Sequence, residues 1–256
     1  MRFSVLGSGS RGNSVYIESG KTGILLDAGF SGKEIDTRLK LIGRDLSNVC
    51  ALCITHEHND HVRGIGVLSR RCSIPTYSNC GTFSAGEKQI GKPFSREEFE
   101  TGDLLQIGDL QVRSFQISHD AADPVGYVVS DGKVSIGYCT DTGKVSHLMC
   151  RRLAECNGLI LEFNHNLQML KNGPYPLPLQ QRVRSSRGHL CNEDAAVFLA
   201  GLIGNHLRTV VLAHLSETNN TPELAKEAVM HTVQEWGETS LVIASQEKAT
   251  ALLHLK

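Results

Sequence analysis

The sequence lacks the features of a membrane protein and of a general polycation. None of its apolar runs is long enough to span a bilayer, and the N-terminus turns glycine-rich at Gly7, too early for a signal peptide. The formal net charge is −1, so binding to nucleic acid would need a local group of basic residues. From these absences we expect a cytoplasmic protein with no membrane segment.

Paired cysteines are scarce as well. Among eight cysteines only Cys50 and Cys53 form a Cys-x-x-Cys, and no second pair accompanies them. A redox motif usually opens a helix, whereas these two residues stand in the apolar run 49–54. We therefore interpret both as strand residues.

What the sequence does contain is an ordinary globular composition, with 40% hydrophobic and 21% charged residues. Strand and helix patterns alternate without a repeat or a linker, which predicts a single α/β domain over residues 1–256, with two sheets between layers of helices. The expected strands cover 3–6, 13–18, 23–27, 49–54, 104–107, 110–117, 126–129, 134–139, 159–161, 209–213 and 241–244. The expected helices cover 31–42, 64–71, 82–88, 145–153, 192–202 and 221–236, and the proline-containing stretch 166–187 is expected to be an irregular insert.

A G-x-G-x-x-G sequence occupies residues 7–12. A dinucleotide site would need a helix directly after it, but residues 13–18 alternate like a strand. The motif is therefore interpreted as the glycine-rich turn of a hairpin. A second interpretation, in which its backbone N–H groups face a phosphate, stays open.

The most informative stretch is 55–61, Thr-His-Glu-His-Asn-Asp-His, which follows the predicted strand 49–54. Imidazoles and carboxylates are costly to bury unless something pairs with them, and a divalent metal accepts all of them at once. His119, Asp141 and His214 also follow predicted strands. Strand ends can converge on one edge of a sheet, so these residues are predicted to join the metal site.

Three neighbouring polar residues are predicted to support the site. Glu57 and Asn59 are expected to point away from the metal. Asp27 ends the strand 23–27 and is either a surface turn residue or a group that orients a metal-bound histidine. Beside a metal site, the second interpretation is favoured.

Through Asp27, the cluster 56–61, His119, Asp141 and His214, in this order, the sequence resembles the metallo-β-lactamase-fold hydrolases. The resemblance implies a four-layer αββα sandwich with two divalent metal ions. It implies that His56, His58 and His119 hold one ion, that Asp60, His61 and His214 hold the other, and that Asp141 bridges them. Such a ligand set suits zinc, manganese or iron, with manganese slightly favoured for phosphate chemistry and zinc next.

Later motifs indicate which branch of this family the sequence resembles. Asp141 stands where a true β-lactamase has a cysteine, and the segments 162–165 and 188–190 resemble the late Glu and His motifs of the nuclease branch. Within that branch the chain looks most like the YycJ/WalJ group in segments 6–14, 118–127, 187–192 and 212–220. That group is associated with 5′→3′ exonuclease activity on double-stranded DNA, which implies a DNA partner and a role in DNA repair. Cys191 stands where serine is expected, and Asn166 where aspartate is expected.

The resemblance also assigns roles in catalysis. A metal-bound hydroxide would attack the phosphodiester, and Asp60 would orient it. His189, held by Glu162, is the candidate acid for the leaving oxygen, although a solvated loop histidine is the plainer interpretation of His189 alone.

Arg182, Arg184 and Arg187 could bind backbone phosphates, or could form a solvated charged loop. Two other functions fit the same residues. A small-molecule hydrolase, either a thioesterase or a cyclic phosphodiesterase, would use the same seven ligands. A non-catalytic domain with a relict site is disfavoured because the ligand set is intact.

Overall fold

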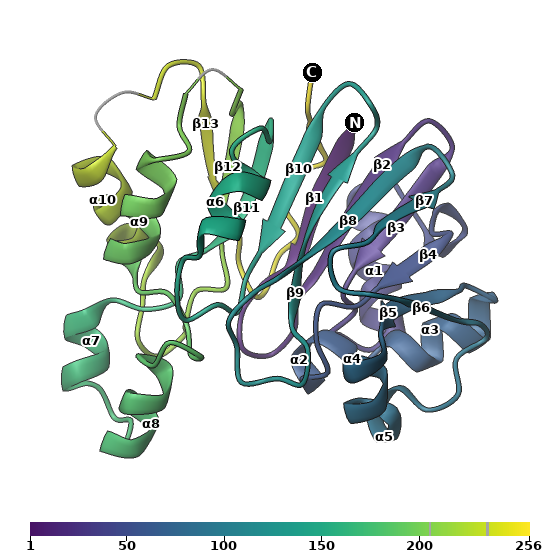
Figure 1. Ribbon diagram of the computed structural model, residues 1–256, viewed down its shortest axis with the longest axis horizontal. Helices are drawn as coiled ribbons and strands as arrows, with labels where there is room; N and C mark the ends of the chain where they lie inside the picture. The colour runs from purple at the N-terminus through teal and green to yellow at the C-terminus, as the bar shows by residue number, and fades with distance from the viewer. Residues whose placement is uncertain (205, 234–235) are drawn as a thin grey trace.

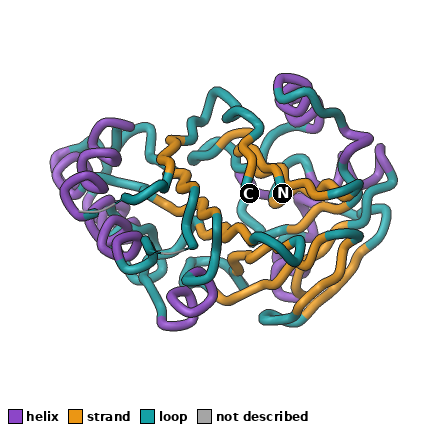
Figure 2. The backbone as a smooth tube through the Cα atoms, turned by 90° about the horizontal axis from the view of Figure 1, so that it is seen from above, coloured by secondary structure: helices purple, strands orange, loops and turns teal. Residues whose placement is uncertain are grey.

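The computed structural model describes residues 1–204, 206–233 and 236–256, which form two facing β-sheets with helices on their outer faces (Figure 1). Seen from above, strands occupy the middle of the molecule, helices lie on its flanks, and the two chain ends lie side by side (Figure 2). This is the four-layer αββα arrangement that the sequence predicts.

Each sheet has seven strands. In spatial order the first sheet contains β14 (Leu253–His254), β1 (Arg2–Gly7), β2 (Ser14–Ser19), β3 (Thr22–Leu26), β4 (Ala51–Cys53), β5 (Thr76–Asn79) and β6 (Arg96–Phe99). The second contains β13 (Ser240–Ile243), β12 (Thr209–Ala213), β11 (Gly158–Glu162), β10 (Ser135–Cys139), β9 (Val125–Ser130), β8 (Leu110–Gln116) and β7 (Leu104–Ile107).

The helices connect these strands. They are α1 (Gly32–Leu41), the 3-10 turn η1 (Leu46–Asn48), α2 (Asn59–Val62), α3 (Ile65–Cys72), α4 (Cys80–Ala85), α5 (Glu87–Ile90), α6 (His147–Leu153), α7 (Leu167–Asn172), α8 (Leu177–Val183), α9 (Asn192–Ala200) and α10 (Pro222–Thr232).

Apolar cores separate the layers. The core between the sheets includes Ile24 and Tyr127, both buried. A second core, which includes Ile35 and Leu68, packs α1 and α3 on the outer face of the first sheet. A third, which includes Phe198, packs α6, α9 and α10 on the second sheet. Burial of apolar area on both faces of each sheet holds the strands rigidly in place.

Strand direction brings the predicted site together. Strands β3 to β6 are parallel to one another, and so are β10 to β13. β8 is antiparallel to β9, which is antiparallel to β10, so β8 runs the same way as β10. The chain segments that leave β3, β4, β8, β10, β11 and β12 therefore emerge at one edge of the molecule.

Some expectations were wrong. The stretch 166–187 is not irregular, because α7 and α8 occupy much of it. The expected helix 82–88 is divided at Gly86 into α4 and α5. The expected helix 221–236 ends at Thr232 as α10, and residues 234–235 lie outside the described residues. Strands β5, β6 and β14 were not expected at all.

The two departures from the YycJ/WalJ pattern are both helix caps. The Cys191 sulfur accepts a hydrogen bond from the Asp194 N–H at the start of α9. The Asn166 side chain accepts from the N–H groups of Gln168 and Met169 at the start of α7. Serine and aspartate are also good caps, so each substitution keeps the local role.

The interpretation of Cys50 and Cys53 is partly confirmed. Cys53 lies in β4 and is fully buried, whereas Cys50 stands one residue before the strand and is exposed. All eight cysteines are free thiols. In the part of the chain that the structure describes, no helix is both long and apolar enough to cross a membrane.

Gly29 holds the first sheet against the histidine cluster and gives a test of the fold. A Cβ atom at Gly29 would lie 1.7 Å from the Asp60 carbonyl oxygen and 2.6 Å from the Asn13 nitrogen, both backbone atoms. Backbone cannot give way cheaply, so we expect Gly29→Ala to lower the free energy of unfolding by about 3 kcal/mol in urea titrations.

The matched control is Gly201→Ala, where the new Cβ would meet only ordinary contacts, the nearest being the Phe198 carbonyl at 3.5 Å. It should change the unfolding free energy by less than about 0.5 kcal/mol. Equal stability of the two variants would contradict this account of the packing.

Candidate metal centre

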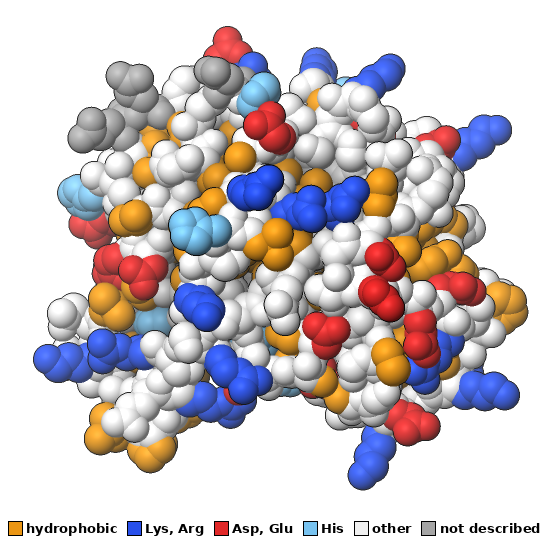
Figure 3. All heavy atoms as spheres, viewed as in Figure 1, with side chains coloured by type: hydrophobic (Ala, Val, Ile, Leu, Met, Phe, Trp, Pro, Cys, Tyr) orange, Lys and Arg blue, Asp and Glu red, His pale blue; other side chains and the backbone are white. Residues whose placement is uncertain are grey.

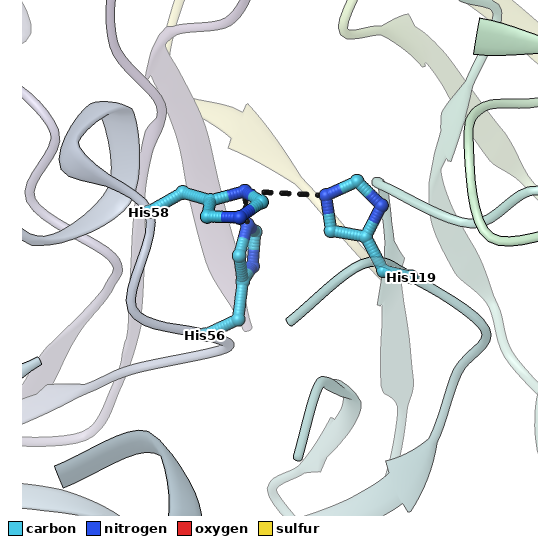
Figure 4. Close-up of side chains that lie close together, drawn as sticks. All are labelled: His56, His58 and His119. Atoms are coloured by element: carbon cyan, nitrogen blue, oxygen red, sulfur yellow. Dashed lines mark hydrogen bonds between the residues drawn. The ribbon is translucent and has the colours of Figure 1, made fainter. Parts of the chain in front are cut away.

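Three imidazoles, those of His56, His58 and His119, converge at the edge of the sheets (Figure 4). His56 follows β4, His58 precedes α2, and His119 follows β8. His56 Nε2 lies 3.1 Å from His58 Nδ1, which lies 3.3 Å from His119 Nε2. Nitrogen atoms this close, with His56 and His119 buried, have the chemistry and spacing to hold one divalent cation.

A second group consists of Asp60, His61 and His214. Asp60 Oδ2 lies 3.5 Å from His61 Nε2 and 3.9 Å from His214 Nε2. Asp60 and His61 come from the short helix α2, and His214 follows β12 in the other sheet. This second group therefore joins the two sheets at their common edge.

Asp141 lies between the two groups. Its Oδ2 is 3.3 Å from His61 Nε2, and its Oδ1 is 3.8 Å from His119 Nε2. Potential ligand atoms of His56, His61 and Asp141 lie within 4.8 Å of one another. The seven residues expected from the sequence as metal ligands are thus all brought together.

Two buried atoms of this cluster are without a hydrogen-bond partner among the described residues. They are Asp141 Oδ2 and His214 Nε2. An unpaired buried acceptor costs free energy, and a carboxylate costs more than a neutral group. Both atoms can coordinate a divalent metal ion through a lone pair, so the residues present fit such an ion.

Asp27 fixes the orientation of His61 from the first sheet. This fully buried carboxylate accepts hydrogen bonds from His61 Nδ1 at 2.8 Å and from the Thr55 N–H and hydroxyl at 2.8 and 2.9 Å. The Tyr138 hydroxyl of the second sheet donates to the same carboxylate at 3.3 Å. Because Nδ1 of His61 is held in this way, Nε2 is directed at the cluster.

Glu162 fixes the orientation of a second histidine of the cluster, His214, from the second sheet. Its carboxylate, also fully buried, accepts from Nδ1 of His214 at 2.8 Å and from Nδ1 of His189 at 2.9 Å. It also accepts three backbone N–H groups, those of Asp141, Thr142 and Leu190. The expected contact to His189 is therefore present, but Glu162 also orients His214, which sequence reasoning missed.

The backbone is strained at three of these positions. Asp27, Asp141 and His214 have φ of 60°, 59° and 55°, in the left-handed region that residues other than glycine rarely adopt. Ser73, which ends α3, is the one other such non-glycine residue in the described chain. Each such residue costs about 1–3 kcal/mol, and the dense hydrogen bonding around the cluster holds it there.

The glycine-rich loop supports the site with side chains. Asn13 Nδ2 donates to Asp60 Oδ2 at 3.3 Å and lies 3.1 Å from His61 Nε2. The Ser8 hydroxyl donates to Asn13 Oδ1 and accepts from the His214 N–H at 2.8 Å. Sequence reasoning gave neither residue a role, although both belong to the segment 6–14 that carries the resemblance.

The loop does not offer its backbone as a phosphate cradle. The N–H groups that bond to other protein atoms are those of Ser8, Gly9, Arg11, Gly12 and Asn13. The β1–β2 hairpin confirms the turn interpretation. These five N–H groups are used within the protein, and Ser10 is the residue of the loop that lines the cavity.

Glu57 and Asn59 lie as expected outside the cluster. Glu57 Oε1 accepts a hydrogen bond from the Ala122 N–H at 2.8 Å, which ties the histidine stretch to the loop after His119. Asn59 is exposed at the start of α2. Both residues are scaffolding.

A cavity of about 270 Å³ opens onto the cluster. Helix α8 forms one wall, where Leu179, Arg182 and Val183 line the cavity with Tyr175 just before the helix. Another part of the lining is polar. It contains Ser10, Asn164, Ser216 and Asn219. The cavity joins the cluster to solvent and is wide enough for part of a substrate.

The three arginines that were expected to bind phosphate lie at different distances from the cavity. Arg182 lines the cavity and forms an ion pair with Asp120, with Nε 2.7 Å from Oδ2. Arg187 Nε donates to the His119 carbonyl oxygen at 3.2 Å and so lies at the rim. Arg184 is exposed and does not line the cavity.

The protonation pattern of the cluster matches a cation site. Burial lowers the pKa of His214, but Asp141 and Glu162 outweigh it and raise that pKa to about 10. Burial likewise lowers the pKa of His61, and Asp141 and Asp27 raise it well above its usual value. Burial lowers the pKa of His56, which stays neutral. Without a metal, protons on His61 and His214 balance the carboxylates.

Residues 22–215 match the family model of the β-lactamase superfamily domain. The exodeoxyribonuclease YycJ of Bacillus anthracis is 39% identical over 239 residues, which cover 93% of this chain and 90% of that protein. The exodeoxyribonuclease WalJ of Streptococcus pneumoniae is 40% identical over 228 residues, which cover 88% and 85%.

Solved structures show the same fold. The metallo-β-lactamase fold protein YhfI of Bacillus subtilis superposes with a TM-score of 0.76 at 16% identity, covering 97% of this chain and 98% of that one. Human short-form tRNase Z superposes with a TM-score of 0.67 at 16% identity, covering 99% and 100%.

Metal binding should release protons, because ligation needs the unprotonated imidazoles of His61 and His214. Both pKa values are raised, so affinity for Mn²⁺ or Zn²⁺ should increase with pH from 6 toward the His214 pKa of about 10. Titration calorimetry in HEPES and in Tris, which differ in ionisation enthalpy, should give heats that depend on the buffer. Buffer-independent heats and a flat affinity between pH 6 and 8 would contradict the assignment.

Proposed function

This chain belongs to the β-lactamase superfamily, and on that basis we propose that it is a metal-dependent exodeoxyribonuclease, one that degrades double-stranded DNA from the 5′ end. The observation that carries the proposal is the pair of buried Glu162 and partly exposed His189 beside the cluster around Asp141, in an open cavity. The names of the YycJ and WalJ relatives support the exonuclease activity. The eight free thiols fit a reducing cytoplasm.

The proposed metal ligands fall into the two spatial groups. His56, His58 and His119 would hold one ion, Asp60, His61 and His214 the other, and Asp141 would bridge them. Manganese is the favoured metal, with zinc next. When bound, such ions lower the pKa of water toward ~7 and neutralise the charge of a phosphate.

The chain itself orients the attacking water. Asp60 lines the cavity, and its side chain is 25% exposed, unlike the buried His61 beside it. One oxygen of this carboxylate can therefore accept a hydrogen bond from the water. Asn13, which donates to Asp60 Oδ2, fixes the rotamer of the carboxylate. Asp60 thereby holds the water in a geometry close to that of the attack on the phosphate.

His189 supplies the proton for the leaving 3′ oxygen. A carboxylate only accepts, so His189 Nδ1 carries the hydrogen that Glu162 receives, and Nε2 remains for the substrate. Burial lowers the pKa of His189, but Glu162 outweighs it and raises that pKa. The raised pKa favours the protonated imidazole, which is the form a general acid needs.

Arg182 is the phosphate ligand that the structure supports best. It lies in the cavity wall, and its ion pair with Asp120 holds the guanidinium in place before substrate arrives. Arginine can then present its remaining N–H groups to a phosphate oxygen. Arg187 at the rim and the exposed Arg184 would contact phosphates further along the strand.

The test is digestion of duplex DNA labelled at the 5′ or the 3′ end, with Mn²⁺. Wild type should release the 5′ label as a mononucleotide first. His189→Ala should lower kcat by about 10²–10⁴ at unchanged metal content, because the leaving oxygen lacks its proton. His231→Ala, at an exposed position on α10, is the matched control and should be fully active.

A p-nitrophenyl phosphodiester separates acid catalysis from a structural role. Its leaving group needs no proton, so His189→Ala should hydrolyse it almost as fast as wild type. Equal losses on both substrates would remove the acid role from His189. Absence of any DNA digestion by the metal-loaded wild type would overturn the proposed function.

A further inference from the structure

We propose that the duplex part of the substrate lies along a row of four basic residues that extends from the cavity rim across α6. The row, called the α6 track, consists of Lys144, Arg151, Arg152 and Arg113. The proposal rests on the proposed function, because it takes the ligand to be the DNA whose end enters the cavity. None of these residues belongs to the metal cluster or lines its cavity.

The track begins at the cavity rim. The Gly143 N–H donates to the Ser118 carbonyl oxygen at 2.9 Å, directly before His119. A Cβ at Gly143 would lie 2.3 Å from the Ser185 carbonyl oxygen, so this turn packs tightly on the segment that leads to Arg187. Lys144, the next residue, is exposed. It is therefore the cation that follows Arg187 along the surface.

A second cavity, of about 710 Å³, connects Lys144 to Arg151. Both residues line it, between α6 and α9, over an apolar floor that includes Leu190 and Phe198. Asp194 is the one carboxylate of its lining. The two cations at the rim outnumber it, so this part of the surface is positive.

Three arginines line a third hollow, of about 240 Å³. Arg151 lines this hollow too, together with Arg152 of α6 and Arg113 of β8. The one carboxylate that lines it, Glu155, is 80% exposed and lies 3.5 Å from His206. Most of the positive charge of the hollow is therefore left for an external anion.

Arg152 gives the clearest sign of such an anion. Its Nε atom is buried, yet it has no hydrogen-bond partner among the described residues. A buried N–H without an acceptor costs about 1–3 kcal/mol, more when the group is charged. The Arg152 guanidinium is thus incompletely paired within the described residues, and a phosphate oxygen is the acceptor that a guanidinium prefers.

The shape of the charged surface favours a long polyanion. Figure 3 shows Lys and Arg side chains gathered over α6 and again further down the same face toward α8, with acidic side chains mostly to either side. The chain carries a net charge of −1, so this is a local pattern and no general excess of basic residues. A duplex presents phosphates at regular spacing along a rod, whereas a mononucleotide would reach only one of the hollows.

The test compares a quadruple variant with a matched control. Lys144, Arg151, Arg152 and Arg113 are changed to Gln. The control changes Lys21, Lys33, Lys40 and Arg71 to Gln, which removes four exposed charges from the hairpin after β2 and from α1 and α3. Affinity for a 30-base-pair duplex is measured by fluorescence anisotropy from 50 to 300 mM NaCl, and hydrolysis is measured on that duplex and on thymidine 5′-(p-nitrophenyl phosphate).

The track variant should lose duplex affinity on the order of 10²-fold at 0.1 M salt, and its slope of log K against log salt should become less negative by roughly 3. Hydrolysis of the small ester should be unchanged, because the track is outside the cavity. The control should match wild type on both substrates. A single strand of equal length should depend less on the track than the duplex does.

Other results separate the two proposals. Wild type that hydrolyses the small ester but neither binds nor digests DNA would overturn the proposed function and the track with it. Wild type that digests DNA, with a track variant of unchanged affinity and salt slope, would overturn the track alone. Equal track dependence for single strands would overturn its assignment to duplex. If Arg152→Gln prevents folding, as judged by circular dichroism, the triple variant at Lys144, Arg151 and Arg113 makes the same test.

Discussion

Negative charge buried where the two sheets meet is the constraint on which the rest of this structure depends. Asp27 and Glu162 are fully buried, and Asp141 nearly so. A buried carboxylate is tolerated only when hydrogen bonds and opposite charge surround it. Asp27 receives those bonds mainly from loops of the first sheet and Glu162 from loops of the second, and each of them holds one imidazole of the cluster. The site is therefore part of what joins the sheets, and its geometry is as rigid as the fold.

The same constraint explains where backbone strain is found. Asp27, Asp141 and His214 leave their strands in the left-handed conformation, which turns each side chain back across the sheet edge. A flexible loop could not keep three such residues in place. Here the parallel strands β3, β10 and β12 hold the chain on one side of each residue, and the carboxylate network holds it on the other. The strain is a consequence of bringing polar side chains from separate strands together at one edge of the sheets.

Much of the fold and of the cluster could be predicted from the sequence, and the features that were missed have physical reasons. The histidine cluster, His119, Asp141 and His214 follow apolar runs, so their common edge follows from strand polarity alone. The supporting roles of Ser8 and Asn13 depend on a loop that folds onto residues more than 40 positions away in the chain, such as His61. Helices α7 and α8 were missed because proline was taken as a breaker, whereas Pro176 precedes α8 and Pro178 lies in its first turn. The α6 track could not be found, because β8 and α6 are brought together only by the fold.

The contacts between the glycine-rich loop and residues 245–246, which follow β13, have a consequence for the timing of assembly. The Ser8 N–H bonds to Ser245, and Gln246 bonds to the Arg11 N–H and to the Gly12 carbonyl, across 235 and 234 positions of the chain. The loop that carries Ser8 and Asn13 therefore finds its final partners only when residues 245–246 have been synthesised. Contacts of such sequence separation form late in folding. A nascent chain that lacks this segment would already contain all seven residues of the cluster, but not the contacts that order the loop beside them. The cluster therefore takes its final geometry only after residues 245–246 have packed on the glycine-rich loop.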